Sequence, residues 1–307
     1  MAELPLYAHW VDVLRKYDPT LTESDLDNNN YIGVNDRSTV RARIDAVCNE
    51  FEEKTGQAFR RLRIGAKDEP TTLEYQEVEG KRLAPPLRLD LDFRQVHPFD
   101  SSEDDLLEIR EGRDSWSDVT DEAGNEFTLD YREGSIKLYR WLIEQIWWDA
   151  PDDRYVRASY RCGALGGDRR LGGQTTLSSD LASDTSTTAV DVADANRLPE
   201  AGPLLIGNDE YVRLTSTDRS TDTLTVDRAV RATSTSSHSS GDPIHYCPEY
   251  LRDAVAAKTA RELLRYEDWV DNLTGTPETA QGASDKMDDW QAQWEELLGR
   301  ESEVRRL

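Results

Sequence analysis

The residues that most often carry catalysis form no known catalytic pattern in this chain. The histidines are His9, His97, His238 and His245. None of them belongs to a zinc-protease motif, and none stands beside a serine or cysteine nucleophile motif. The glycine pairs at 166–167 and 172–173 do not lead from a strand into a helix, so they do not predict a phosphate-binding loop. Carboxylates are abundant everywhere, which makes any single pair uninformative as a glycosidase-type site. We therefore expect no enzyme.

One acidic stretch, residues 25–36, matches part of a calcium-binding loop. Asp25, Asp27 and Asn29 hold the first, third and fifth positions of such a loop, and Asp36 holds the twelfth. Against a calcium site, an asparagine replaces the usual turn glycine, and an aspartate rather than a glutamate closes the loop. Two interpretations stay open: a structural calcium ion, or a polar loop that caps the next helix. No other cofactor is expected.

Apolar residues at helical spacing predict the helices of the fold, which must position the polar side chains described above. We expect a helix at residues 4–17, a second one in which Val40, Ile44, Val47, Cys48 and Phe51 recur at helical spacing, and two more at 248–270 and about 283–298. The second helix is capped by Asp36 or Ser38, and Gly56 stands where a C-terminal cap belongs. Pro248 suits the first turn of the third helix.

Between the second and third helices the apolar period changes toward two, which is typical of strands. The expected strands lie in "QAFRRLRIG", "TTLEYQEVEG", "LRLDLDF", "DLLEIREG", "EFTLDYREGSIKLYRW" and "RYVRASYRCG". The fifth of these is a hairpin that turns at residues 132–134, and Gly163 closes the last. After a glycine-rich linker at 165–174, short alternating segments rich in Ser, Thr and Asp predict a small barrel or sandwich at 175–246.

The expected fold class is α+β, with one domain interrupted by another. Residues 1–174 and 247–270 form a discontinuous α+β domain with helices and a strand and hairpin region, and residues 175–246 form an inserted β-module. The ends of the module must lie close together, and we expect it to fold independently and to be removable. Residues 271–307 are a linker followed by a C-terminal helix.

The C-terminal helix carries an apolar stripe on a segment otherwise rich in Asp and Glu. Its members are Met287, Trp290, Trp294, Leu297 and Leu298. A short helix beyond a linker has little of its own to pack on, so we predict that the stripe is an assembly interface. The alternative is that it packs on the core of its own subunit.

The charge balance narrows the classes of partner. The chain has 307 residues, with 61 Asp and Glu against 37 Lys and Arg, and a net charge of −24. This excess fits the solvated acidic surface of a halophilic protein, and it predicts that the chain repels DNA. The three cysteines are expected to be buried free thiols. No apolar run is long enough to span a bilayer, so we expect no membrane partner and synthesis in the cytoplasm.

Several of these segments resemble, in order, the head–tail connector (adaptor) proteins of tailed viruses. In that family an amphipathic helix ends in a Thr-Gly pair followed by an aromatic residue, and Thr55, Gly56 and Phe59 stand there in "ARIDAVCNEFEEKTGQAF". A strand region around "LRLDLDFRQVHPF", a turn at Trp116, the hairpin "FTLDYREGSIKLY", the strand "YVRASYRCG" and the helix opened by Pro248 follow. The resemblance covers roughly residues 20–165 and 247–270.

The inserted module resembles a β-module that recurs in viral virion and tail proteins. There an "IG-x-E-Y" strand leads to an "LTV-x-R" strand, then to a Ser/Thr-rich segment, a histidine and "GDP". The matching residues are Ile206, Glu210, Tyr211, Leu224, Val226, Arg228, His238, Gly241 and Asp242. Ala229 departs from the pattern, because the glycine usual after the arginine is replaced here.

The resemblance implies a virion protein at the head–tail interface. Its copies would form a ring, a dodecamer, beneath the portal protein, contact tail or tail-completion proteins, and line a channel through which DNA passes without specific binding. The acidity fits a virus of a halophilic archaeon, and it equally fits a repulsive channel wall. The alternatives are a tail or cell-surface module whose β-insertion recognises a surface ligand, and an enzyme of unknown chemistry.

Overall fold

The computed structural model describes residues 4–17, 19–20, 37–77, 86–111, 115–139, 154–166, 172–264 and 277–303. It is a mixed α+β structure that divides into two compact units. The first unit comprises Met1–Thr55 and Gly166–Leu307, and the second comprises Gly56–Leu165. The helices and the β-module therefore belong to one unit, and the strand region belongs to the other. This division differs from the expected one, in which the helices and the strand region shared a domain.

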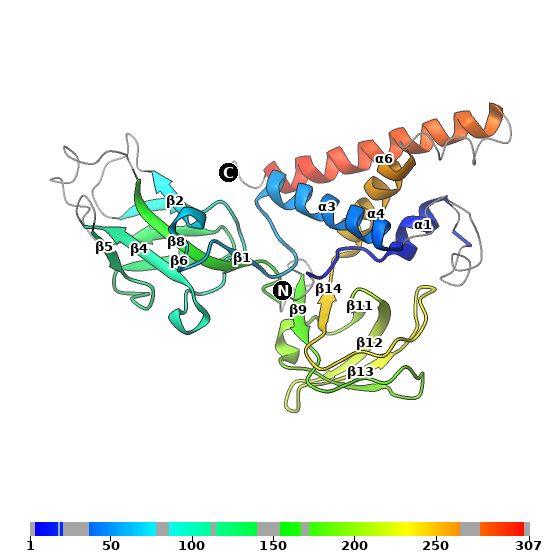
Figure 1. Cartoon of the computed structure of the whole chain (residues 1–307), viewed down its shortest axis with the longest axis horizontal. Helices are drawn as coiled ribbons and strands as arrows, with labels where there is room; N and C mark the ends of the chain where they lie inside the picture. The colour runs from blue at the N-terminus through cyan, green and yellow to red at the C-terminus, as the bar shows by residue number, and fades with distance from the viewer. Residues whose placement is uncertain are drawn as a thin grey trace. The chain divides into compact units, whose positions relative to one another are not determined.

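Four α-helices of the first unit pack together (Figure 1). They are α1 (Trp10–Tyr17), α3 (Arg37–Thr55), α4 (Glu249–Leu264) and α6 (Pro277–Glu303). Helix α6 packs on α4 and α3, and α1 packs on the same two helices. The apolar positions expected to face the core of α3 are all buried: Val40, Ile44, Val47, Cys48 and Phe51. Gly56 follows with φ +61°, which confirms the glycine cap.

Two helix boundaries differ from the prediction. The first helix begins at Trp10 rather than at residue 4, because the preceding segment is bound to the β-module. The Leu6 amide donates to Asn208 Oδ1 at 2.8 Å, and Asn208 Nδ2 donates to the Leu4 carbonyl at 3.0 Å. The last helix begins at Pro277, so half of the expected linker is helical. Residues 265–270 of the expected third helix lie outside the described residues.

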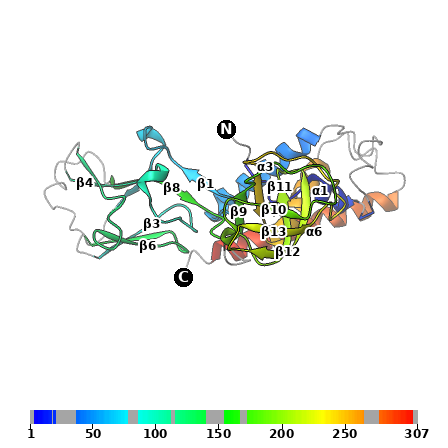
Figure 2. The ribbon, with the colours of Figure 1, turned by 90° about the horizontal axis from the view of Figure 1, so that it is seen from below.

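The β-module is one six-stranded antiparallel sheet that curls into a half-barrel (Figure 2). Its strands are β9 (Gly173–Thr176), β10 (Ala189–Asp191), β11 (Gly202–Ile206), β12 (Glu210–Asp218), β13 (Thr223–Asp227) and β14 (Pro243–Tyr246), in the order β10-β13-β12-β11-β14-β9. The two edges meet at one bridge, between Leu177 and Val192. The first and last strands pair, with Gly173 opposite Tyr246, so the ends of the module lie side by side as expected.

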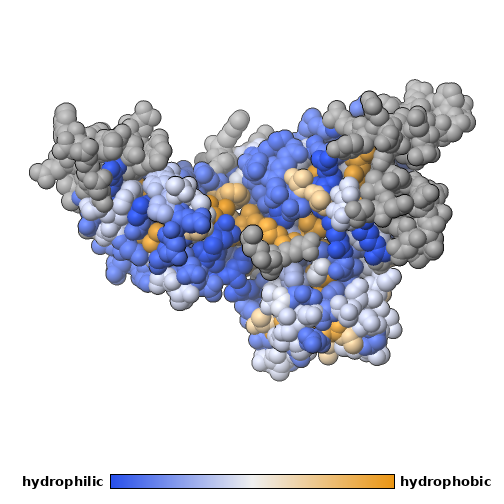
Figure 3. All heavy atoms as spheres, in the orientation of Figure 1, coloured by the Kyte–Doolittle hydropathy of each residue, from blue (hydrophilic) through white to orange (hydrophobic). Residues whose placement is uncertain are grey.

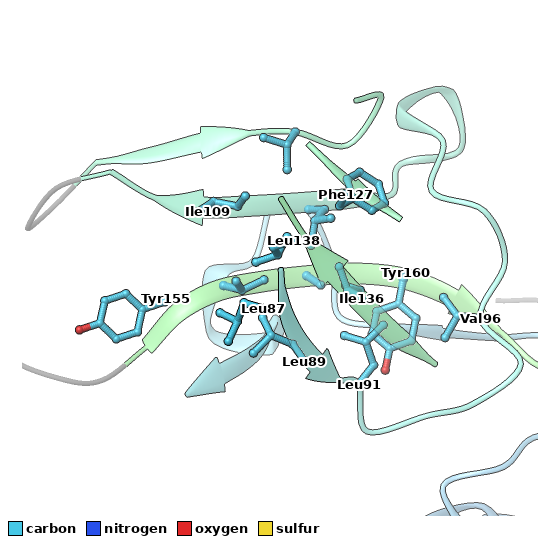
Figure 4. Packing of buried hydrophobic residues seen from close by; sticks show 14 of the residues in the cluster. Leu87, Leu89, Leu91, Val96, Ile109, Phe127, Ile136, Leu138, Tyr155 and Tyr160 are labelled. Atoms are coloured by element: carbon cyan, nitrogen blue, oxygen red, sulfur yellow. The ribbon is translucent and has the colours of Figure 1, made fainter. Parts of the chain in front are cut away.

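The second unit contains two antiparallel sheets around one core. The strands are β1 (Leu62–Ile64), β2 (Glu74–Glu77), β3 (Leu87–Asp90), β4 (Leu106–Arg110), β5 (Trp116–Asp118), β6 (Phe127–Asp130), β7 (Ser135–Leu138) and β8 (Arg154–Cys162). One sheet has the order β1-β8-β4-β5, with β2 also paired to β8, and the other has the order β3-β7-β6. Leu89, Ile136, Phe127, Ile109 and Tyr160 come from both sheets and pack together between them (Figure 4).

The predicted hairpin is confirmed, since β6 and β7 are joined by residues 131–134. Gly134 has φ +64°, and a Cβ there would overlap the carbonyl oxygen of Phe93. Only glycine fits this turn without strain. Trp116 begins strand β5 and is not in a turn, which corrects the expectation for that residue. Trp116 pairs with Arg110 of β4, and the guanidinium of Arg157 lies over its ring, 4.5 Å from the ring centroid. The described residues also include short 3₁₀ helices at η1 (Pro70–Thr72), η2 (Ser101–Glu103) and η4 (Ala195–Arg197).

Candidate functional site

The apolar stripe of the C-terminal helix packs inside its own subunit. Trp294 and Trp290 are 1% and 8% exposed, Leu297 is 5% exposed, and Met287 and Leu298 are half-buried. The Trp294 ring lies 6.2 Å from that of Phe51 in α3, and the Trp290 ring lies 5.9 Å from that of Tyr17 in α1. The expectation that this helix has little of its own to pack on is wrong, because α6 is long enough to cross α3 and α4. Its role in assembly stays a prediction.

The candidate calcium ligands Asp25, Asp27, Asn29 and Asp36 lie outside the described residues. Among the residues that are described, no group of three or more His, Cys, Asp or Glu side chains is placed to hold a metal ion. No helix in the described ranges is both long and apolar enough to cross a membrane. All three cysteines are buried free thiols, as expected.

The charged residues of the β-module pattern meet in a buried cluster, which we define as Glu210, Arg228 and His238. The side chains of Glu210 and Arg228 are fully buried. Arg228 Nε and Nη2 donate to the two carboxylate oxygens of Glu210 at 3.0 and 2.5 Å. His238 Nε2 lies 3.3 Å from Glu210 Oε2. A bidentate pair of this kind fixes the geometry of both partners.

The cluster also holds the loops of the module. Arg228 donates to the carbonyl oxygens of Ala182, Asp184 (3.1 Å) and Ser236 (2.7 Å). Glu210 in turn accepts the backbone amides of Ala229 at 3.1 Å and Ser236 at 3.0 Å. Because β12, β13 and two long loops are joined at one ion pair, these residues have a structural role. A buried pair that satisfies its remaining hydrogen bonds fixes one arrangement of a polar loop region.

The hydrogen bonds set the protonation of Glu210. Burial by itself raises the pKa of a carboxyl group. Here the bonds from His238, Arg228 and the two backbone amides outweigh burial and lower the pKa of Glu210 to about 2. The carboxylate is therefore charged at neutral pH and is fully engaged. It is not a free acid or base for chemistry.

The backbone conformations of Gly207 and Ala229 explain why the β-module pattern has glycine at these two positions. Gly207 has φ +57°, and a Cβ there would approach His238 Nδ1 to 3.0 Å. Ala229 has φ +54°, in the left-handed region that L-residues adopt only at a cost. The turn after Arg228 therefore keeps the conformation that glycine favours, although the chain carries alanine there.

Three parts of the β-module contact the helices and the segment before them: the loop between β11 and β12, the start of β12, and β14. The Tyr211 hydroxyl donates to Asp12 Oδ2 in α1 at 2.6 Å, and Arg41 in α3 pairs with Asp209. The rings of Tyr7 and His245 stack with centroids 5.9 Å apart. The sequence identified Tyr211 as part of the β-module pattern, but it did not predict which residue Tyr211 would contact. The structure argues against the expectation that the module can be removed, because its removal would leave the buried Asp12 without this partner.

The exposed residues of the β-module include many Ser and Thr residues, in a chain that is otherwise rich in Asp and Glu. Exposed positions on β12 and the following turn are mostly hydroxyl residues, among them Thr215, Ser216, Ser220 and Thr221. In Figure 3 much of the visible face of the module is pale, with a few blue and orange residues among the pale ones.

Sequence reasoning missed one face of mixed charge in the second unit, where Asp90 and Asp130 occupy the register row next to Arg88 and Lys137. Arg88 in β3 and Lys137 in β7 are exposed and stand directly opposite each other on the outer side of the three-stranded sheet. The signal was available, since both residues occupy outward positions of alternating strands. It was overlooked because the overall composition is acidic.

No protein-family model matches the sequence, and no curated protein is significantly similar to it.

Proposed function

We propose that the chain is a head–tail adaptor of a tailed virus that infects a halophilic archaeon. In this role its copies form a ring, a dodecamer, under the portal and join the capsid to tail or tail-completion proteins. The ring surrounds the passage through which DNA moves without specific binding. The chain acts as a structural virion protein, and no step of this role requires catalysis.

The observation that carries the proposal is the end of helix α3. The helix ends at Thr55, whose hydroxyl donates to the Phe51 carbonyl at 2.7 Å. Gly56 then turns the chain with φ +61°, and Phe59 is fully buried. This is the conformation that a helix ending in Thr-Gly and followed by a core aromatic residue requires. The most distinctive segment of the resemblance thus has a local structure that supports it.

A second line of support comes from the β-module. The charged residues of its pattern are used in holding its own loops together, and its exposed positions are largely hydroxyl residues. A module with a rigid interior and a surface rich in hydroxyl residues suits a passive decoration of a virion ring. The net charge of −24 suits either a saline host or a channel wall that DNA does not bind.

Co-expression with the portal protein of the same viral genome tests the proposal. We expect the chain to copurify with the portal, and class averages of the complex to show a ring of this chain with cyclic symmetry. A chain that never binds the portal, and instead binds host cells as a monomer or trimer, would contradict the adaptor role and favour the surface-binding alternative. The purified chain without portal is the control for spontaneous ring formation.

A further inference from the structure

The N-terminal segment, which we define as residues 4–9, runs between the β-module and the helices (Figure 1). All of it except Leu4 is buried, although it forms neither a helix nor a strand. Asn208 of the β-module binds its backbone, and the Tyr7 hydroxyl donates to the buried carboxylate of Glu52 in α3. The position of the segment therefore depends on contacts with residues far along the chain.

His9 ends the N-terminal segment and caps helix α1. Its ring nitrogen Nδ1 accepts the backbone amide of Val11 at 3.3 Å, and its own backbone amide donates to Asp12 Oδ2 at 3.1 Å. This is the reciprocal arrangement of a capping box, with a histidine in place of the usual serine or threonine. A ring nitrogen that accepts a hydrogen bond carries no proton, so the imidazole is neutral and its proton is on Nε2.

The surroundings of His9 disfavour a positive charge on its ring. The side chain is fully buried, and the ring of Tyr211 from the β-module lies 5.6 Å away. Burial, followed by the positive charge of Arg41 in α3, lowers the pKa of His9 to about 3, and Arg37 acts in the same direction. The carboxylate and the backbone of Asp209 favour the charged ring but are outweighed. The positive end of the α1 dipole adds to the cost of an imidazolium at this position.

We propose that His9 is an acid-sensitive switch, and that protonation of its imidazole releases the N-terminal segment from the β-module. An imidazolium cannot accept the Val11 amide, so the cap of α1 is lost, and its charge is hydrated only when the segment leaves the buried junction. A histidine whose folded pKa lies below its unfolded value of 6.5 contributes stability above pH 6.5 and loses that contribution as the pH falls toward 3. The pKa of Glu210 begins from 4.5, so its effect occupies a lower pH range. The switch is a property of the subunit and does not depend on the proposed ring.

Hydrogen exchange of the full chain, measured by mass spectrometry at constant molar salt and at a series of pH values, tests the inference. After correction for intrinsic exchange rates, the protection of residues 4–12 should fall about tenfold for each pH unit below 6.5, because each release takes up one proton. The loss should be roughly thirtyfold at about pH 5 relative to about pH 7.5. Strand β13 in the same unit and the β6–β7 hairpin in the other unit are internal controls, and both should keep their protection.

His9→Asn is the test variant, because asparagine caps a helix but does not titrate in this pH range. Its N-terminal segment should keep its protection to within about threefold over the same range. His9→Ser is a second capping variant in case asparagine disturbs folding, and His97→Gln is the matched control, which should keep the wild-type pH dependence.

Three outcomes would overturn the inference. The first is wild-type protection that does not change between about pH 7.5 and 5. The second is a capping variant that loses protection with the same pH dependence as the wild type. The third is a parallel loss in strand β13, which would mean that acid unfolds the whole unit rather than releasing the segment.

Discussion

The hydroxyl of Tyr211 in the β-module donates a hydrogen bond of 2.6 Å to the carboxylate of Asp12 in helix α1. Both residues are buried, and the same carboxylate oxygen accepts the backbone amide of His9 at 3.1 Å. Burial and the negative charge of Asp12 raise the pKa of Tyr211 well above its usual range. The Tyr211 hydroxyl therefore keeps its proton, and remains a donor, through the alkaline range in which a free tyrosine ionises. The bond makes the position of the module on the helices part of the fold.

Tyr211→Phe is expected to lower the free energy of unfolding by about 1.5–3 kcal/mol, the usual worth of a hydrogen bond to a buried charged group. Denaturant unfolding followed by circular dichroism measures the change. The matched control is Tyr131→Phe, which removes an exposed hydroxyl and should change stability by no more than about 0.5 kcal/mol. Equal stability of the two variants would show that the module is only loosely attached.

Ala229→Gly is expected to stabilise the chain by about 1 kcal/mol. Ala229 has φ +54°, where an L-residue carries a steric penalty of about 1–2 kcal/mol that glycine avoids, although glycine loses more entropy on folding. Ala254→Gly in the middle of α4 is the control, and it should destabilise by about 1 kcal/mol or more. A loss of stability in Ala229→Gly would contradict the strained turn. Thermal unfolding of both variants provides the comparison.

The buried pair of Glu210 and Arg228 predicts acid sensitivity. The pKa of Glu210 falls from 4.5 to about 2 on folding. A carboxyl group with a depressed folded pKa contributes stability above its unfolded pKa and loses that contribution as the pH falls toward the folded value. The contribution is about 3 kcal/mol near neutral pH, and it disappears between about pH 4.5 and 2.

Glu210→Gln isolates this contribution from those of the other carboxylates. At neutral pH the variant should be less stable than the wild type by about 3–5 kcal/mol, because Arg228 is left buried without a counter-charge. The difference should narrow as the pH falls from 4.5 toward 2. A difference that stays constant with pH would mean that Glu210 has no depressed pKa. Denaturant unfolding at several pH values measures it.

The net charge of −24 predicts that the protein needs salt. At molar salt the Debye length is about 3 Å, so repulsion between surface carboxylates is screened. In dilute buffer the screening is lost, and we expect the melting temperature to fall or the assembly to dissociate. Thermal melts in sodium chloride from dilute to molar concentrations test this. An unchanged melting temperature would reject salt adaptation as the reason for the acidity.

Local sequence patterns predicted the helices and strands well, but they did not predict which distant residues these elements contact. The face of α3, the Gly56 cap and the hairpin at Gly134 follow from spacing and from glycine conformation, and all three are present. Leu6 fits a helix by its spacing from Trp10, but Asn208 binds the backbone of Leu4 and Leu6 from far along the chain, and no local pattern predicts that contact. The same limit explains the cluster of Glu210, Arg228 and His238. The pattern named these residues, but only the curled sheet brings them together.

The stripe on α6 permits a test that separates the core from an interface. Trp294 is almost fully buried against Phe51 of α3, so Trp294→Ala should lower the free energy of unfolding by about 3–5 kcal/mol. Met287 and Leu298 belong to the same stripe but are half-buried, so Met287→Ala with Leu298→Ala should cost much less stability. If the stripe also contacts a neighbouring subunit or the portal, this double variant should stay folded and assemble more weakly. Circular dichroism melting measures the stability of each variant, and size-exclusion chromatography of each variant mixed with the portal protein measures its assembly. Together they distinguish a core role of the stripe from an interface role. Unaltered assembly of the double variant would restrict the stripe to the core of its own subunit.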